Sequence, residues 1–192
     1  VIILPTIPFG VNTGQTDIYL DMNMSPSTQM AVLIRDVLTV LNRQGLHKFL
    51  ILNSHGGNDF KTILRELGLE FPKMFLSTCN WFQALDKSKY FEEEGDHADE
   101  METSIMMHIN PEFVLPLTEA GLGKQKKSVI KGFREKWAWK ERKWSVITED
   151  TGTGNPKKST SEKGRKFFED VTDKISELIQ DICKENPDEL YK

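Results

Sequence analysis

The feature that most constrains this chain is an apolar run that ends in a polar, glycine-bearing turn. Residues 48–52 (KFLIL) have the length and the β-branched and aromatic content of a buried parallel strand, and residues 53–58 (NSHGGN) follow at once. A helix-like segment begins near Asp59. His55 is therefore expected at the carboxyl end of a strand, which is where open α/β sheets bind ligands.

The two glycines after His55 favour a binding role for this turn. Gly56 and Gly57 allow a sharp turn and a close approach of the backbone to whatever His55 holds, which would be a metal or a substrate. The same residues also fit a simpler interpretation, a polar turn in which Asn58 caps the following helix. The six residues alone leave both interpretations open.

Strand-like and helix-like segments alternate along the chain and predict its fold class. Helical spacing of apolar residues runs over 27–45 and 59–68, and strand-like composition is found at 1–4 and 74–81. This βαβ succession predicts an α/β fold with a mainly parallel sheet and helices on its faces. A final helix is expected from about Ser161. Its predicted core stripe comprises Phe168, Val171, Ile175, Leu178, Ile179 and Ile182.

Composition narrows the class of protein. With 192 residues, 38% hydrophobic and 28% charged, the chain is expected to form a single domain over 1–192. A net charge of −4 argues against a nucleic-acid partner, and no apolar run approaches the roughly 18 residues of a membrane span. Cys79 and Cys183 lie far apart and are not expected to form a disulfide. We expect a cytoplasmic protein with no membrane partner.

A second informative stretch covers residues 95–104 (GDHADEMETS). A helix is expected to begin at about Asp99, with Met101, Ile105 and Ile109 facing inward. Glu102 then lies in its first turn, where the helix dipole favours a carboxylate, and His97 lies in the loop before it. The alternative is that these are ordinary first-turn charges and a surface histidine.

Tryptophans and glycines elsewhere give weaker signals. Trp81, at the end of the 74–81 strand, could stack on a flat substrate or simply pack. Residues 124–143 are rich in Lys and Arg, with Trp137, Trp139 and Trp144 in or next to them, as in some nucleic-acid strips. Interspersed glutamates favour instead an extended segment with one packed face. The glycine loop at 151–156 lacks the Gly-Lys-Ser/Thr ending of a phosphate-binding loop.

Four blocks together carry a family resemblance. They are LPTIPFG at 4–10, NSHGGN at 53–58, HADEMETS at 97–104 and GTGNP at 152–156. Their order and spacing resemble the creatininase (creatinine amidohydrolase) family over about the whole chain, least clearly across 115–149.

The resemblance implies a three-layer α/β/α sandwich and a metal-dependent hydrolase of non-peptide C–N bonds. It implies one or two divalent ions per subunit (Zn, Mn or Fe), a small-molecule substrate and assembly as a homohexamer. The roles it implies are as follows: His55 a metal ligand, Glu102 a carboxylate at the metal with a catalytic role, His97 the proton-transfer or substrate-binding residue, and Trp81, Gly56 and Gly57 parts of the substrate pocket.

Two departures from the family pattern shape the functional prediction. The first metal motif of the family, Glu-x-His followed by Asp, precedes the block that corresponds to Val1, so we expect the domain to lack its N-terminal strand and that motif. Creatininase itself has a bulky residue and a carboxylate in place of Gly56 and Gly57, which argues against creatinine as the substrate. We therefore predict hydrolysis of a small cyclic amide or a formamide. A peptidase-like maturation enzyme and a non-catalytic homo-oligomeric scaffold are the alternatives.

Overall fold

The computed structural model describes residues 1–191, apart from the side chains of residues 30–32. The chain divides into two compact units. The first comprises Val1–Thr13, Met22–Ala84 and the chain from Asp173 onward, and the second comprises Gly14–Asp21 and Leu85–Thr172. Each unit is described by itself, and the expectation of one domain over 1–192 stays a prediction.

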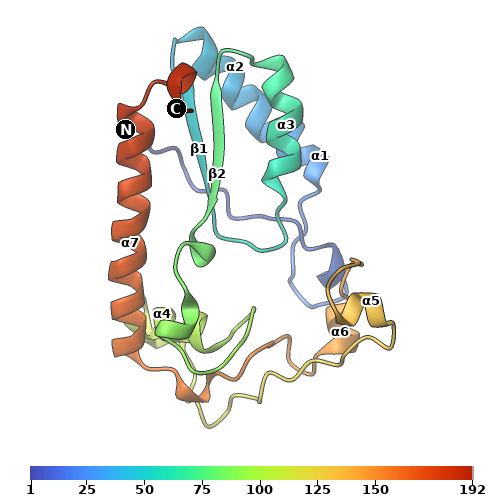
Figure 1. The fold of residues 1–192 in the computed structure, drawn as a ribbon. Helices are drawn as coiled ribbons and strands as arrows, with labels where there is room; N and C mark the ends of the chain where they lie inside the picture. The colour runs from blue at the N-terminus through green and yellow to red at the C-terminus, as the bar shows by residue number, and fades with distance from the viewer. Residues whose placement is uncertain (192) are drawn as a thin grey trace. The chain divides into compact units, whose positions relative to one another are not determined.

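The helices and strands appear in Figure 1 in chain order. They are α1 (Pro26–Thr28), the π-helix η2 (Gln29–Ile34), α2 (Arg35–Arg43), β1 (Lys48–Asn53), α3 (Phe60–Glu70), β2 (Phe75–Asn80), α4 (Glu100–Ile109), α5 (Lys131–Arg134), α6 (Trp144–Ile147) and α7 (Ser161–Lys184). Short 3-10 turns are η1 (Thr13–Gln15), η3 (Trp81–Gln83), η4 (Lys87–Lys89), η5 (Pro111–Phe113), η6 (Pro156–Lys158) and η7 (Pro187–Glu189).

The first unit is built on a βαβ crossover. β1 and β2 pair in parallel, in a register that runs from Lys48 opposite Phe75 to Asn53 opposite Asn80, and α3 connects them. The predicted parallel pairing and the helices between the strands are confirmed. Both strands therefore end at the same edge of the sheet, where residues 53–58 follow β1 and Trp81 follows β2.

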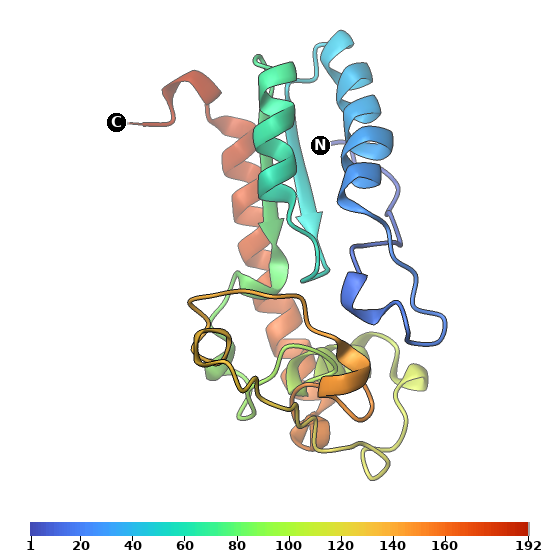
Figure 2. The same cartoon turned by 90° about the vertical axis from the view of Figure 1, so that its right-hand side faces the viewer.

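The core of this unit lies between the sheet and helices α2 and α3. Leu38 on α2 and Leu67 on α3 are completely buried, and they pack with Phe49 and Ile51 of β1 and Leu76 of β2. The apolar residues recur at three- and four-residue steps, so each helix presents one apolar stripe to the strands. Figures 1 and 2 show the C-terminal part of α7 on the opposite side of the strands, which gives this unit three layers.

Two predictions of apolar segments are wrong. Residues 1–4 form no strand, and Val1 and Ile3 are 89% and 90% exposed, because β1 and β2 pair with each other and no described strand offers this segment a ladder. In α7 the predicted stripe is wrong only at its first member: Phe167 is completely buried and Phe168 is 39% exposed, whereas Val171 is buried as predicted.

The second unit packs α4 against the first part of α7. Gly164 allows the close approach, because a Cβ there would lie 1.9 Å from the Ser104 carbonyl oxygen. Phe167 packs against Phe91, with ring centroids 5.3 Å apart, and Met101 of α4 is buried. The start of α4 after Asp99 is confirmed, but Ile109 at its end is 46% exposed rather than packed inward, since it is the last residue of the helix.

Candidate active site

The turn after β1 is held by the side chain of Asn53. This amide is 3% exposed. Its Oδ1 accepts hydrogen bonds from the His55 N–H (3.1 Å) and from Nδ2 of Asn58 (3.0 Å), and its Nδ2 donates to the His55 carbonyl (2.9 Å) and to Oδ1 of Asn80 (2.8 Å). All the hydrogen-bonding capacity of the amide is thereby used, which fixes the backbone of the turn against both strands.

The ring of His55 has a defined tautomer. Its Nε2 lies 2.9 Å from the carbonyl oxygen of Val11, and since a carbonyl only accepts, Nε2 must carry the hydrogen. In the neutral ring the lone pair is then on Nδ1. Metal-ligating histidines commonly donate their other N–H to a backbone carbonyl in this manner. The orientation of His55 therefore fits the predicted role of a ligand that binds through Nδ1.

Two glycines make room for this ring. A Cβ on Gly10 would lie 2.7 Å from Cδ2 of His55, and a Cβ on Gly57 would lie 2.5 Å from its Nε2 and 2.2 Å from the Val11 oxygen. A Cβ on Gly56 would meet nothing within 4 Å. Of the two glycines predicted to allow a close backbone approach, Gly56 and Gly57, only Gly57 does so. Gly10 has the same role and was not predicted.

The alternative role of Asn58 as a helix cap is wrong. Asp59 holds the N-cap position of α3 without a side-chain bond. The Asn58 Oδ1 accepts instead from the Val11 N–H (3.0 Å) and from Nε2 of Gln29 (2.9 Å). In this orientation the Asn58 amide donates to Asn53 and accepts from both of these donors. A side chain turned to cap α3 would lose these hydrogen bonds.

Trp81 lies in the same unit as the His55 turn. It is the first residue after β2 and is half-buried, with its ring edge-on to Phe82 at 5.9 Å between centroids. Since Asn53 and Asn80 are opposite each other in the sheet, Trp81 and His55 follow neighbouring strands at one edge. The structure places Trp81 as expected, and its role as a pocket wall stays a prediction.

The second unit holds the other predicted site residues together at the start of α4. Asp99 is the N-cap, and its Oδ1 accepts from the Glu102 N–H at 2.9 Å. Oε2 of Glu102 in turn accepts from the Ala98 N–H at 2.7 Å and lies 4.0 Å from Nδ1 of His97. The carboxylate and the imidazole therefore face each other at the positively polarised end of a helix.

The backbone beside His97 is strained. Ala98 has a φ of +48°, a left-handed conformation that costs a non-glycine residue about 1 kcal/mol. It is held by the bond from its N–H to Glu102 and by a bridge in which the Thr153 N–H donates to the His97 carbonyl at 2.8 Å. Strain of this kind persists only where the surroundings impose it, and it is common in functional loops.

The acidity of Glu102 is altered by its surroundings. Burial of this half-buried side chain raises its pKa, and the nearby Asp99 carboxylate adds to the effect, while the Ala98 N–H and His97 oppose it. Glu102 thus keeps a proton to higher pH than an ordinary glutamate. A carboxyl with a raised pKa beside an imidazole is a pair suited to exchanging a proton.

A tryptophan from much further along the chain contacts His97, and an arginine holds that tryptophan. The ring of Trp144 lies 5.1 Å from that of His97 at 69°, and the indole is 8% exposed. The Arg142 guanidinium lies 4.3 Å above the same indole, and its Nη1 is 2.8 Å from Oδ2 of Asp96. Sequence analysis missed this contact, because Trp144 was grouped with Trp137 and Trp139, which are 75% and 80% exposed.

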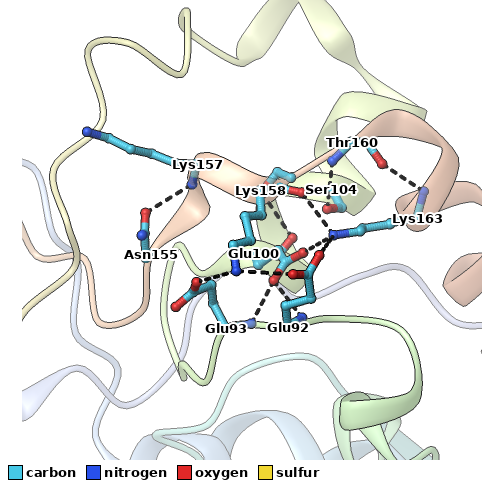
Figure 3. A network of polar contacts seen from close by, with 10 residues as sticks. Glu92, Glu93, Glu100, Ser104, Asn155, Lys157, Lys158, Thr160 and Lys163 are labelled. Carbon is cyan, nitrogen blue, oxygen red and sulfur yellow. Dashed lines mark hydrogen bonds and ion pairs between the residues drawn. The ribbon is translucent and has the colours of Figure 1, made fainter.

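A buried carboxylate anchors the segment that leads to His97 (Figure 3). Glu100 is completely buried; its Oε2 accepts from the Glu92 and Glu93 N–H groups at 2.9 and 2.8 Å, and its Oε1 pairs with Nζ of Lys163. Lys158 pairs with the carboxylates of Glu92 and Glu93 at 3.1 and 3.0 Å. The network ties the start of α7 to α4 and to the chain before the His97 loop.

The described side chains do not form a complete metal centre. Among residues 1–191, no group of three or more His, Cys, Asp or Glu side chains is arranged to hold a metal ion. His55 belongs to the first unit and Glu102 to the second, so each fits as a single ligand within its own unit.

No helix among the described residues is both long enough and apolar enough to cross a bilayer.

Comparisons with known proteins bear on this site. The Creatininase family model, for creatinine amidohydrolase, matches residues 1–179. A protein of Bacteroides fragilis NCTC 9343, provisionally assigned as a creatinine amidohydrolase, is 41% identical, with a TM-score of 0.89 over 98% of this chain and 74% of its own. No protein of curated function matches.

Two further solved structures share the fold at low identity. A creatinine amidohydrolase (creatininase) is 15% identical, with a TM-score of 0.73 over 95% of this chain and 75% of its own. A mutant creatininase of Zn–Zn type is 17% identical, with a TM-score of 0.64 over 84% of this chain and 66% of its own. The chain thus has the predicted creatininase-like α/β fold.

Proposed function

Because the chain belongs to the creatininase family, we propose that it is an amidohydrolase that cleaves a C–N bond of a small cyclic amide or formamide. The observation that carries the proposal is the facing pair of His97 and Glu102 at the start of α4, held by a strained backbone. Strained, over-determined loops of this kind favour a functional role over two ordinary surface charges.

The chemistry proposed for the pair is proton transfer. Amide hydrolysis consumes one water, and a proton must pass from the attacking water to the leaving nitrogen. Glu102, whose pKa is raised by burial, holds a proton more readily than an ordinary carboxylate, and His97 faces it at 4.0 Å. The two groups can therefore accept the proton of the water and deliver it to the leaving amine.

A divalent ion is also part of the proposal, as Zn, Mn or Fe and as one or two ions per subunit. His55 would hold an ion through Nδ1, and the Glu102 carboxylate is proposed as a ligand within its own unit. Such an ion supplies an acidified water and polarises an amide carbonyl. Support comes from the ring orientation of His55 and from the Zn–Zn type creatininase of the same fold. The described residues form no group of three or more such ligands, so further ligands would have to join either residue.

The substrate proposal rests on the turn after β1. The Val11 carbonyl and the His55 ring fill the space that a side chain at position 57 would occupy, so the glycine backbone lies directly against the imidazole. Trp81 offers a flat face at the same sheet edge. A planar cyclic amide or a compact formamide suits such a wall, and creatinine is not the proposed substrate.

The assembly and location are proposals of the same kind. We propose a homohexamer in the cytoplasm with a small-molecule substrate and no nucleic-acid or membrane partner. The proposal follows from membership of the creatininase family. Light scattering on the purified protein would give the mass directly, and a monomer would refute the hexamer.

Elemental analysis of the purified protein tests the function first. We expect stoichiometric Zn, Mn or Fe that is lost in His55→Ala and retained in His47→Ala, an exposed histidine of the same unit. The comparison is made on this 192-residue chain and on one extended by any residues that naturally precede it. Hydrolysis of hydantoin, N-formylaniline and creatinine is then assayed. A folded protein without metal at either length would refute the hydrolase and favour the scaffold alternative.

A further inference from the structure

The segment at residues 142–144 contacts the proposed catalytic histidine from much further along the chain. Trp144 is the first residue of α6 and is almost completely buried, which is unusual beside the exposed Trp137 and Trp139. Its indole contacts the His97 ring edge-to-face, at 5.1 Å between centroids. A buried aromatic ring against an imidazole restricts the rotation of that imidazole.

Trp144 is itself held from another direction. The Arg142 guanidinium lies 4.3 Å above the indole, where the cation and the ring attract each other. Nη1 of Arg142 is bound to Asp96, the residue before His97, at 2.8 Å. Asp96 also accepts a hydrogen bond from the Thr153 hydroxyl. Arg142, Trp144 and His97 are thus linked by successive contacts, and the bond from Arg142 to Asp96 returns to the residue before His97.

We propose that Trp144, clamped by Arg142 and Asp96, is a positioning residue that sets the ring orientation of His97 for proton transfer with Glu102. The catalytic part of this proposal rests on the proposed function. The geometric part does not, because it concerns only which side chain fixes the imidazole. Trp144 need not touch the substrate for this role.

The alternative to a positioning role is plain packing of a buried indole. The two differ in what a smaller aromatic ring does. Phenylalanine keeps an aromatic face for His97 but has less surface for the guanidinium, so Trp144→Phe should retain part of the effect. Alanine removes both contacts. Loss of packing alone would instead lower stability without a selective change at His97.

Histidine NMR tests the geometric part, since the chain has only four histidines. In the wild type the Cε1–H signal of His97 is expected to be displaced by the indole ring current. The displacement should be lost in Trp144→Ala, partly kept in Trp144→Phe and reduced in Arg142→Gln, with the signals of His47, His55 and His108 unchanged. Trp139→Ala, at an 80% exposed site, is the matched control. An unchanged His97 signal in Trp144→Ala would overturn the proposal.

Kinetics on the best probe of the hydrolysis panel test the catalytic part. We expect kcat to fall by up to about 100-fold in Trp144→Ala with KM nearly unchanged, and Trp144→Phe to recover much of it. A displaced His97 signal with unchanged kcat would also overturn the proposal. An inactive wild type refutes the proposed function, while the NMR comparison still decides whether Trp144 sets the His97 ring. Should Trp144→Ala not fold, Trp144→Phe and Arg142→Gln carry both measurements.

Discussion

The two histidine-bearing segments of this protein are built by different means. The turn at His55 is held by amide side chains at positions 53 and 58, only a few residues away, and by the Val11 carbonyl. The loop at His97 is held by Glu102 and, much further along the chain, by Trp144 and Thr153. The first segment is shaped by a network of hydrogen bonds between amide groups, and the second combines a nearby carboxylate with an indole and a backbone bridge from about 50 residues further along the chain.

This difference indicates how each histidine should respond to change. His55 has a narrow slot between glycines, so its position depends on steric room. His97 lies beside Ala98, whose backbone is held in a left-handed conformation, so the position of His97 depends on contacts that offset this strain. Substitutions that remove anchors should therefore affect His97 more, and those that add atoms should affect His55 more.

The largest effect is expected where the anchor of the His97 segment is a buried charge. Glu100→Gln removes the partner of Lys163 and weakens the acceptor for two backbone N–H groups. Breaking a buried ion pair costs about 3–5 kcal/mol in the free energy of unfolding, which urea denaturation would measure. Glu162→Gln, which removes a 74% exposed partner of Arg165, should cost less than about 0.5 kcal/mol. Equal losses in the two variants would contradict the role assigned to Glu100.

An added methyl group tests the steric side of the comparison. Gly57→Ala puts a Cβ 2.2 Å from the Val11 oxygen and 2.5 Å from Nε2 of His55, so one of them must move. We expect a loss of about 1–3 kcal/mol in unfolding free energy and a shifted His55 NMR signal. Gly56→Ala is the matched control, since a Cβ there has no neighbour within 4 Å. If the two alanine variants were equally stable, the slot around His55 would not be as tight as described.

The contrast also explains what could be predicted from the sequence. The β1–α3–β2 crossover and the start of α4 follow from apolar periodicity and helix-start residues, which are local signals, and both are confirmed. Two of the four family blocks contain the candidate residues His55, His97 and Glu102. Glu102 was correctly expected in the first turn of α4 because a carboxylate there is favoured by the helix end.

What could not be predicted depends on tertiary partners. The apolar residues 1–4 look like a strand, but strand formation needs a neighbouring ladder, and the described chain supplies none. The role of Trp144 could not be predicted because residues 115–149 form short irregular pieces without a helical or strand periodicity. The neighbouring Trp137 and Trp139 suggested instead that all three tryptophans share one face. Only the folded contacts distinguish the buried tryptophan from the exposed ones.

The smallest expected effect is a pair of opposite pH dependences, one in each unit. The pKa of Glu102 is raised above its ordinary 4.5 by burial, so between 4.5 and the raised value the folded protein holds a proton that the unfolded chain has released. Its contribution to stability therefore falls as pH rises through that window. The pKa of Glu70 is lowered by hydrogen bonding to Arg35, so its contribution is lost as pH falls below 4.5.

Urea midpoints of the metal-free protein, measured from about pH 3.5 to 7.5 with a chelator present, would separate the two. Glu102→Gln should flatten the decline above about pH 4.5, and Glu70→Gln should flatten the loss of stability below it, because glutamine does not titrate. The signs are the informative part, since Glu70 is an exposed partner of a surface pair and contributes little in magnitude. If Glu102→Gln left the upper slope unchanged, the carboxyl that faces His97 would titrate as an ordinary glutamate, and the proton exchange proposed for the pair would lose its physical basis.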